Sequence, residues 1–197
     1  MKTTIIMAVI IFGLTATTRA QTSVTSPARN HLVVRSEQFS ELQRLIDERA
    51  SRGYRLTGIS YHTSVKNLSS KGRLEVDFEP ADVSGKYEYR ALITEFDAQA
   101  LERALSEEGA KGFRLIKQTP IPVELGLMRP RDMFIAVMEK TADPGVSYKY
   151  HVVAYRRRQY VSQHIKRAFA EGFVKACDTQ FGPVTYLVME KATNRAE

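Results

Sequence analysis

The chain has 197 residues, of which 43% are hydrophobic and 26% charged, and its net charge is +7. A chain of this length buries roughly two thirds of the surface that its unfolded form exposes, so a hydrophobic core is enough to stabilise it. Cys177 is the only cysteine, which excludes a fold that depends on internal disulfides. We expect Cys177 to be a buried, unreactive thiol.

Residues 1–20 have the layout of a secretory signal peptide. Lys2 precedes an apolar run from Ile5 to Leu14, and small and hydroxyl residues follow as far as Ala20. This run is too short for the roughly 30 Å hydrocarbon layer of a bilayer. We therefore expect cleavage after Ala20, with an uncleaved anchor as the alternative. The sequence predicts an exported protein, periplasmic or extracellular, with no transmembrane anchor after cleavage.

Three glycines, each followed by an aromatic residue, recur at intervals of 59 and 60 residues: Gly53, Gly112 and Gly172. Apolar residues stand eleven, seven and three positions before each glycine, which is the spacing of one stripe along a helix. This stripe, widened by the residue eight positions before, comprises Leu42, Leu45, Ile46 and Ala50; Leu101, Ala104, Leu105 and Gly109; and Val161, His164, Ile165 and Phe169. We expect each helix to end at its glycine, which adopts a positive φ without a Cβ clash.

Strands are predicted on both sides of each helix. The first strands centre on 32–34, 91–93 and 151–153; the second follow the glycines at 54–61, 113–119 and 173–179; the third are 73–79, 133–140 and 185–191. The predicted fold class is α+β, with three tandem β-α-β-β repeats and helices packed on a mostly antiparallel sheet. The repeats span residues 21–84, 85–144 and 145–197.

The connection between the second and third strands differs most among the predicted repeats. It runs from Val65 to Gly72 in the first repeat, from Pro120 to Pro130 in the second and from Gln180 to Pro183 in the third. Loops that vary on a common scaffold are where binding functions concentrate. We expect the segment from Pro120 to Pro130 to be a loop that could serve as a lid.

The helix–glycine–strand pattern resembles that of an uncharacterised family of small bacterial domains, marked by a helix, a G-x-x-G-aromatic motif and a strand. The closest match is EEGAKGFRLI at 107–116, and ASRGYRL at 50–56 has Ala50 in place of the first glycine. The third segment departs further, with Phe169 at that position and Val174-Lys175 instead of Arg-Leu. The resemblance implies the fold and a bacterial source, and it implies no activity, cofactor or catalytic residue.

No glycine-rich phosphate loop, metal-spaced Cys/His pair or nucleophile elbow is present in the sequence, so we predict no catalytic residue and no cofactor. His151, His164 and Cys177 fall in the same predicted repeat, and together they could form a transition-metal site. The interpretation we favour is a pair of partly buried histidines that bond backbone or carboxylate groups. We therefore predict no metal, with these three residues as weak candidates.

Opposite charges recur at matching positions of the predicted strands. Arg55 and Arg114 open two second strands, while Glu79, Glu139 and Glu190 lie near the ends of the third strands. We expect cross-strand ion pairs on the solvent face, each contributing under about 1 kcal/mol. A repeated Arg/Glu substrate site is the alternative.

The excess of positive charge lies in the last segment. Residues 145–197 contain nine basic and four acidic residues, whereas residues 21–84 contain nine and eight and residues 85–144 contain nine and ten. Arg156, Arg157, Arg158 and Tyr160 are the candidate ligand-binding residues, because basic and aromatic side chains there suit an anionic polymer or membrane headgroups. The alternative is a solvated loop, and export argues against a nucleic-acid partner.

Our leading hypothesis is an exported, non-enzymatic repeat domain of unknown function that acts as a binding or interaction module, with an unknown protein or an anionic envelope component as its partner. The first alternative is a small-ligand-binding protein or enzyme with its site between repeats, which a deep pocket lined by His151, His164 or Glu139 would favour. The second is a binder of polyanions or of an anionic envelope component through the basic third repeat.

Overall fold

The computed structural model describes residues 30–66, 69–81, 87–116, 119–123, 132–140, 145–157 and 161–194, without the side chains of 64–66 and 69–71. The predicted signal peptide, Arg158 and Tyr160 lie outside these residues. Across the described ranges, no helix is long and apolar enough to cross a bilayer.

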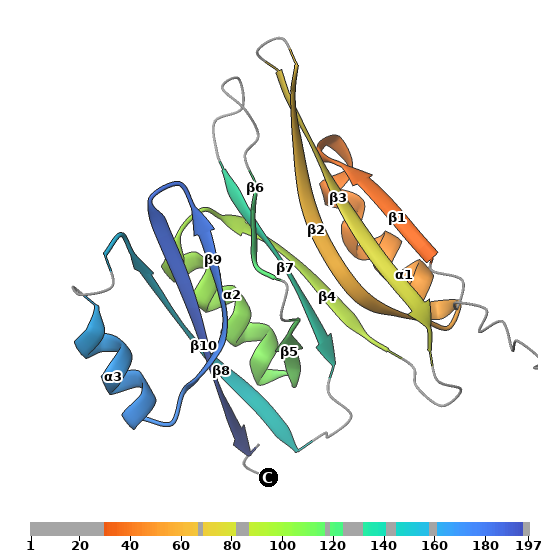
Figure 1. Ribbon diagram of the computed structural model, residues 1–197. Coiled ribbons are helices and arrows are strands. Elements are labelled where there is room, and N and C mark those ends of the chain that lie inside the picture. The colour runs from red at the N-terminus through yellow and green to blue at the C-terminus, as the bar shows by residue number, and fades with distance from the viewer. Residues whose placement is uncertain are drawn as a thin grey trace, which may run out of the picture.

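The fold is α+β, with short helices and antiparallel sheets (Figure 1). The helices are η1 (Ser36–Glu41, a 3-10 helix), α1 (Leu42–Ser51), α2 (Ala98–Ala110) and α3 (Ser162–Ala170). The strands are β1 (Asn30–Arg35), β2 (Tyr54–Lys66), β3 (Ser69–Pro80), β4 (Tyr89–Glu95), β5 (Phe113–Leu115), β6 (Ile121–Val123), β7 (Met133–Lys140), β8 (Val146–Tyr155), β9 (Val174–Phe181) and β10 (Val184–Asn194).

The strands form separate sheets rather than the single sheet that we predicted. Their orders are β1-β3-β2 in the first sheet, β4-β7-β5 with β6 also on β7 in the second, and β8-β10-β9 in the third. Every strand pair among the described residues is antiparallel. The strand that is last in sequence therefore lies in the middle of each sheet, and the two strands joined by the helix flank it.

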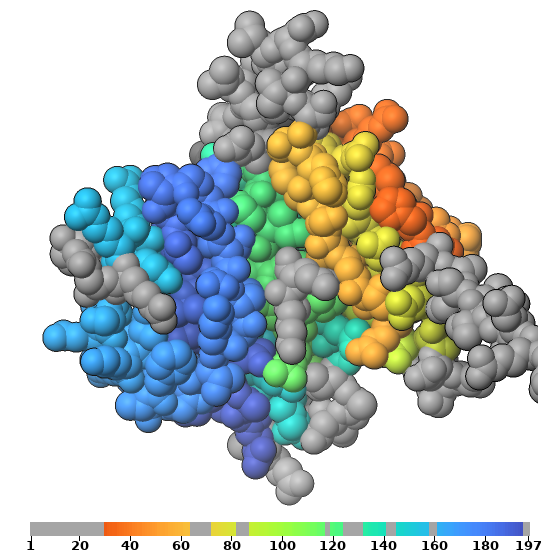
Figure 2. Space-filling model, in the orientation of Figure 1, coloured from red at the N-terminus to blue at the C-terminus, as the bar shows by residue number. Residues whose placement is uncertain are grey.

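Helices and sheets alternate through the molecule. One hydrophobic cluster joins Leu42 and Ile46 of α1 to both the first and the second sheet, and another joins Leu101 and Leu105 of α2 to the second and the third. Helix α3 packs with Ile165 on the third sheet. In Figure 1 the order runs from β1 on the right to α3 on the left, and Figure 2 shows the same segments as neighbouring bands of colour.

The three glycines end their helices as predicted. Gly53, Gly112 and Gly172 have φ values of 82°, 90° and 89°, a region that residues with a Cβ rarely adopt. The amide of each glycine donates to the carbonyl of the residue three positions earlier. The helix–glycine–strand pattern in the sequence therefore marks real helix ends.

The predicted buried stripe holds for α1 and α2 but is wrong in part for α3. Phe169 is 48% exposed, His164 is exposed as well, and Ala168 is buried in their place. The physical reason is that α1 and α2 each pack between two sheets, whereas the hydrophobic cluster of α3 contains only its own flanking residues and the third sheet. A narrower buried face is enough for such a helix.

Two of the connections that we predicted as loops form strands instead, at least in part. The segment from Val65 to Gly72 is mostly strand, because β2 and β3 continue as one long hairpin on either side of residues 67–68, which lie outside the description. In the second sheet, β5 ends at Leu115 and the chain forms a further strand, β6, whose buried Ile121 and Val123 pair with β7. The first part of the expected lid is thus core, and its residues 124–130 lie outside the described ranges.

Helix α2 approaches β8 so closely that a side chain at Gly109 has no room. A Cβ at this position would overlap the carbonyl oxygen of Tyr148 and lie 2.9 Å from the Tyr150 ring. We predict that Gly109→Ala destabilises the fold by about 1–3 kcal/mol, as overpacking does, although the same change in an open helix stabilises by up to about 1 kcal/mol. The measurement is the urea midpoint followed by circular dichroism.

The matched control is Glu107→Ala on the exposed side of the same helix, which should leave the midpoint nearly unchanged. An increase in stability for Gly109→Ala would contradict the close approach of α2 and β8.

Candidate functional site

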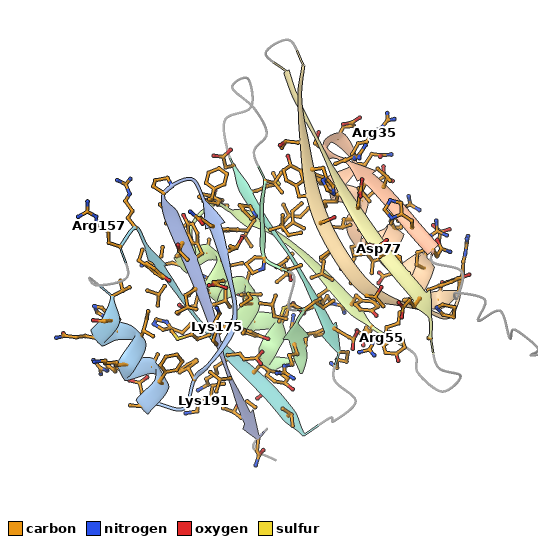
Figure 3. All side chains as sticks on the ribbon, in the orientation of Figure 1. Arg35, Arg55, Asp77, Arg157, Lys175 and Lys191 are labelled. Atoms are coloured by element: carbon orange, nitrogen blue, oxygen red, sulfur yellow. The ribbon has the colours of Figure 1, made fainter. Side chains whose placement is uncertain are left out.

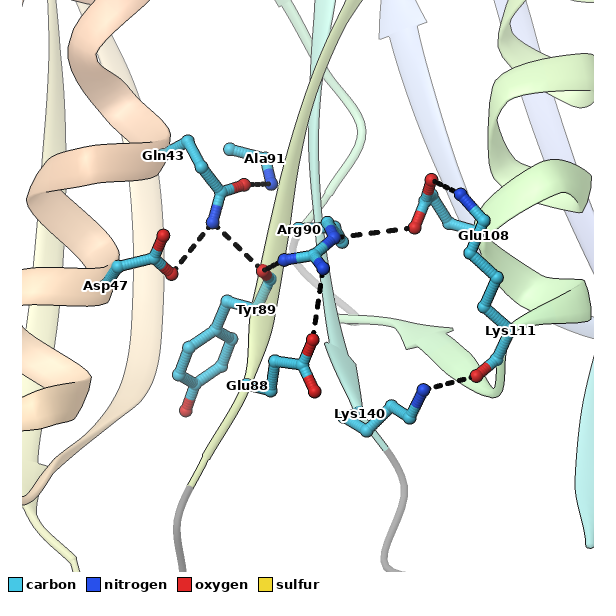
Figure 4. Close-up of polar contacts among 9 residues, drawn as sticks. All are labelled: Gln43, Asp47, Glu88, Tyr89, Arg90, Ala91, Glu108, Lys111 and Lys140. Carbon is cyan, nitrogen blue, oxygen red and sulfur yellow. Dashed lines mark hydrogen bonds and ion pairs between the residues drawn. The ribbon is translucent and has the colours of Figure 1, made fainter. Parts of the chain in front are cut away.

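The free edge of β4 is covered by a side chain of the preceding helix. Gln43 of α1 donates from Nε2 to the carbonyl of Tyr89 (3.0 Å) and accepts at Oε1 from the amide of Ala91 (2.7 Å), as Figure 4 shows. An edge strand otherwise presents unpaired backbone groups. The amide side chain of Gln43 thus takes the place of a neighbouring strand.

The free edge of β8 is covered by α2 in the same manner. Ser106 accepts from the amide of Tyr150 (3.2 Å), and Glu102 accepts from the amide of Val152 (2.8 Å). Glu102 stands ten residues before Gly112, the same offset that Gln43 has from Gly53. The same carboxylate oxygen of Glu102 also contacts Nδ1 of His151 at 2.9 Å. We call these two contact zones, α1 with β4 and α2 with β8, the joints.

An arginine–glutamate pair links consecutive sheets at each joint. Arg55 of the first sheet binds Glu139 of the second (3.0 Å), and Arg114 of the second sheet binds Glu190 of the third (Nε–Oε1 3.0 Å). We predicted pairs within a sheet, and Arg55 does stand opposite Glu79 in the strand register. The prediction is wrong in that the ion pairs run to the next sheet, because successive sheets are stacked.

A buried tyrosine completes each joint. The Tyr89 hydroxyl accepts from the amide of Leu56 (3.0 Å), and the Tyr150 hydroxyl accepts from the amide of Leu115 (2.8 Å). Burial raises the pKa of both hydroxyls well above the usual value for tyrosine. Hydrogen bonding to its glutamate raises the pKa of each joint arginine, so both guanidinium groups keep their charge at any physiological pH.

A groove of about 470 Å³ passes along the joints and contains Glu139, one of the pocket residues that we predicted. Its charged lining includes both joint arginines with their glutamates, which already satisfy one another. Each arginine also stacks over a tyrosine ring, Arg55 at 5.0 Å from Tyr87 and Arg114 at 5.7 Å from Tyr148. Lys175, which also lines the groove, pairs with Asp178 of its own strand (2.9 Å). The arginines and glutamates of the groove are engaged in holding the sheets together.

Helix α3 has no joint of this kind within the described residues. Ser162, Lys166 and Phe169 stand at the offsets that Glu102, Ser106 and Gly109 occupy in α2, and Val174 and Lys175 stand at those of Arg114 and Leu115. Phe169 is 48% exposed and Val174 57%. In α2 the corresponding Gly109 and Arg114 both lie against Tyr148. The flank of α3 that carries Phe169 is thus exposed, whereas the corresponding flank of α2 lies against β8.

The outer face of the first sheet is charged rather than apolar. His31 contacts Asp77 (3.0 Å), and Arg73 binds Glu75 (2.8 Å), which also lies 3.3 Å from His62. These carboxylates hold the places that Val137 and Ile135, both fully buried, have on β7 of the second sheet. This face is suited to water.

The candidate basic cluster is only partly described. Arg156 and Arg157 are exposed after the end of β8, and Figure 3 shows Arg157 projecting away from the third sheet. Arg158 and Tyr160 lie outside the described residues. The role of this cluster in ligand binding stays a prediction.

A cavity of about 320 Å³ lies beside α3, and both predicted histidines of this region line it. His151 comes from β8 and His164 from α3. The other lining residues are Glu102, Tyr150, Arg167, Ala168, Glu171 and Phe173. This is a pocket between the second and third segments of the kind that our first alternative required.

The third metal candidate lies elsewhere, so the grouping of His151, His164 and Cys177 is wrong. Cys177 is buried in β9, where its thiol donates to the carbonyl of Thr119 (3.0 Å). The predicted burial of this thiol is confirmed, and burial raises its pKa to about 12, which favours an unreactive thiol. Among the described residues, no group of three or more His, Cys, Asp and Glu side chains is placed to hold a metal ion.

Comparison of the chain with family models, with curated proteins and with solved structures finds no match.

Sequence reasoning found the two histidines of the cavity but not the residues around them. Glu102, Arg167 and Glu171 look like the ordinary charged positions of two helices, and only the fold brings them to one wall. Phe173 was taken as a strand residue. A signal was available in the third segment, whose departures from the common pattern mark both the cavity and the exposed pair Phe169 and Val174.

The two joint ion pairs should differ in their contribution to stability. The Glu190 side chain is 7% exposed and that of Glu139 22%. Removing the partner of a buried charge leaves it uncompensated. We expect Arg114→Ala to cost about 2–3 kcal/mol, below the roughly 3–5 kcal/mol of a fully buried pair because Arg114 is half exposed, and Arg55→Ala to cost about 1 kcal/mol or less.

Urea denaturation of both variants measures the difference, and the double variant Arg114→Ala with Glu190→Gln should recover part of the loss. Equal effects of Arg55→Ala and Arg114→Ala would contradict the assignment.

Proposed function

We propose that the chain is an exported, non-enzymatic binding module made of three tandem copies of one β-α-β-β unit. Three features support the repeat: the common offsets from the glycines, the shared strand order of the sheets, and the two joints built from residues at matching positions. Export, a bacterial source and the family resemblance rest on the sequence alone and are part of this proposal.

The observation that carries the binding function is the uncovered flank of α3. We define the tail surface as Ser162, Lys166, Phe169, Val174 and Lys175, all of which are exposed. In the first two units the corresponding flank is covered by the first strand of the next unit. Exposed phenylalanine and valine on one end of an otherwise closed stack are typical of an interaction surface.

The occupant that fits the tail surface is an extended, acidic segment of a partner protein with an aromatic anchor. At the joints the same flank receives a β-strand that carries two tyrosines, Tyr87 and Tyr89 or Tyr148 and Tyr150. Lys166 makes the surface basic, and residues 145–197 hold nine basic against four acidic residues. Complementary charge selects such a partner and speeds its association.

A second copy of the chain fits this surface poorly. Phe169 stands where Gly109 permits the backbone of β8 to approach α2. The first sheet presents Glu75 and Asp77 where the second presents Ile135 and Val137, so a second copy offers no apolar face for α3 to cover. Charged outer faces of this kind oppose head-to-tail association of repeat proteins.

Display of peptide libraries tests the tail surface. Two twelve-residue libraries are selected against the mature chain, one with four acidic positions and one central aromatic, the other with the same acidic positions and a central glycine. We expect enrichment of the aromatic library only, and a loss of binding of at least tenfold for Phe169→Ser with Val174→Ser.

The matched control is Val33→Ser, which removes an exposed apolar side chain (44%) from the first sheet and should leave peptide binding unchanged. If both libraries are enriched equally and the variant Phe169→Ser with Val174→Ser still binds their peptides, the chain binds polyanions without an aromatic anchor. That result would overturn the proposed role of the tail surface.

A further inference from the structure

The second sheet contains a guanidinium site that is filled from within the chain. Arg90 of β4 lies over the ring of Phe113 (4.9 Å), its Nε is 3.6 Å from Glu108, and its Nη2 is 3.1 Å from Glu88. Lys140 approaches the same ring at 4.5 Å. Figure 4 shows Arg90 between Glu88 and Glu108, with Lys140 bonded to the carbonyl of Lys111. A guanidinium over an aromatic face beside carboxylates is a favourable arrangement.

The third sheet keeps half of this arrangement and lacks the other half. Phe173 follows Gly172 as Phe113 follows Gly112, and Lys191 lies 6.0 Å from its ring as Lys140 does from Phe113. The arginine is replaced: His151 stands opposite Met189, whereas Arg90 stands opposite Met138 in the second sheet.

The carboxylate beside the arginine is also lost. Ala168 stands four residues before Gly172, at the offset of Glu108 from Gly112. The shorter side chains of His151 and Ala168 therefore line open space, the cavity of about 320 Å³, where the second sheet holds Arg90 and Glu108.

The wall of the cavity supplies new carboxylates in place of the lost one. Glu102 uses Oε2 for the amide of Val152 and for His151, and Glu171 uses Oε1 for Nε of Arg167 (3.1 Å). Their other oxygens, Oε1 of Glu102 and Oε2 of Glu171, receive no hydrogen bond from any residue in the described part of the chain. Two open acceptors next to an aromatic ring are what a planar cation with several N–H donors requires.

The arginine and the lysine near the cavity have contacts of their own. Arg167 is 82% exposed and pairs with Glu171. Lys191 donates to the carbonyl of Glu171, as Lys140 does to Lys111 in the filled site. His151 contacts Glu102 through Nδ1, and His164 lies on the opposite wall. The filled site of the second sheet likewise holds its guanidinium beside a lysine.

We propose that the cavity between α2, β8 and α3 binds a guanidinium cation, which takes the position that Arg90 occupies in the second sheet. The ligand stacks on Phe173 and donates to Glu102 and Glu171. This site is independent of the tail surface: His164, Arg167 and Glu171 lie on one flank of α3, and Ser162, Lys166 and Phe169 lie on the other.

Titration with two guanidinium probes tests the site, followed by the amide resonances of residues 150–152 and 171–173. Agmatine represents a free small cation, and Nα-acetyl-arginine methylamide represents an arginine side chain of a protein. We expect saturable shifts with at least one of them, and the tighter probe identifies the source of the cation. Saturable shifts with inorganic phosphate, together with no shift from either guanidinium probe, would overturn the proposal.

The decisive variant is His151→Arg with Ala168→Glu, which rebuilds the filled site of the second sheet inside the third. We expect it to fold with an unchanged or higher melting temperature and to bind the preferred probe at least tenfold more weakly. Undiminished binding would contradict the assignment.

Glu171→Gln provides a second readout should the rebuilt variant fail to fold, because it keeps the size of the side chain and removes one charge. It should weaken binding at least threefold, and unaltered affinity would count against the site. Glu107→Gln, which removes one carboxylate from the exposed side of α2 outside the cavity lining, is the matched control and should bind as the unmodified protein does.

Discussion

The architecture depends on satisfying the free edge of the first strand in each of the second and third sheets. A strand edge leaves backbone donors and acceptors without partners, and burying these groups unpaired costs free energy. Here the helix of the preceding segment supplies the partners through its side chains, Gln43 for β4 and Glu102 with Ser106 for β8. The position of each sheet is therefore set by the helix before it, and helices and sheets alternate.

The same constraint explains why the two ends of the stack differ from its middle. The first sheet has no described helix over its outer face, and that face carries His31, Asp77 and Glu75 in mutual contact. The last helix has no described strand along its flank, and there Phe169 and Val174 remain exposed. The outer face of the first sheet is thus charged and suited to water, whereas α3 at the other end keeps exposed apolar side chains within a basic region. The proposed partner site and the proposed cation site both lie in this last segment, on opposite flanks of α3.

The sequence predicted the elements well and their assembly poorly. Helix stripes and glycine positions depend on spacing within a few residues, so they could be read directly, and the buried Cys177 followed from composition. The arginine–glutamate pairs were assigned to the wrong sheets because residue spacing cannot reveal how sheets stack. The acidic wall of the cavity was missed for a related reason: Glu102 lies in α2 and Glu171 follows the end of α3, and only the replacement of Arg90 and Glu108 by His151 and Ala168 opens the space between them. Both replacements are present in the sequence, but their meaning can be recognised only once the filled site of the second sheet is known.

Amide hydrogen exchange at the edge of β8 tests the central claim most directly. The amide of Val152 has a side-chain acceptor, Glu102, in place of a neighbouring strand. The account predicts that Val152 exchanges slowly in the intact protein, and that Glu102→Ala speeds its exchange at least tenfold while a central amide such as Val188 stays protected. Fast exchange of Val152 in the unmodified protein, or slow exchange that Glu102→Ala leaves unchanged, would contradict the claim that helix side chains close the sheet edges.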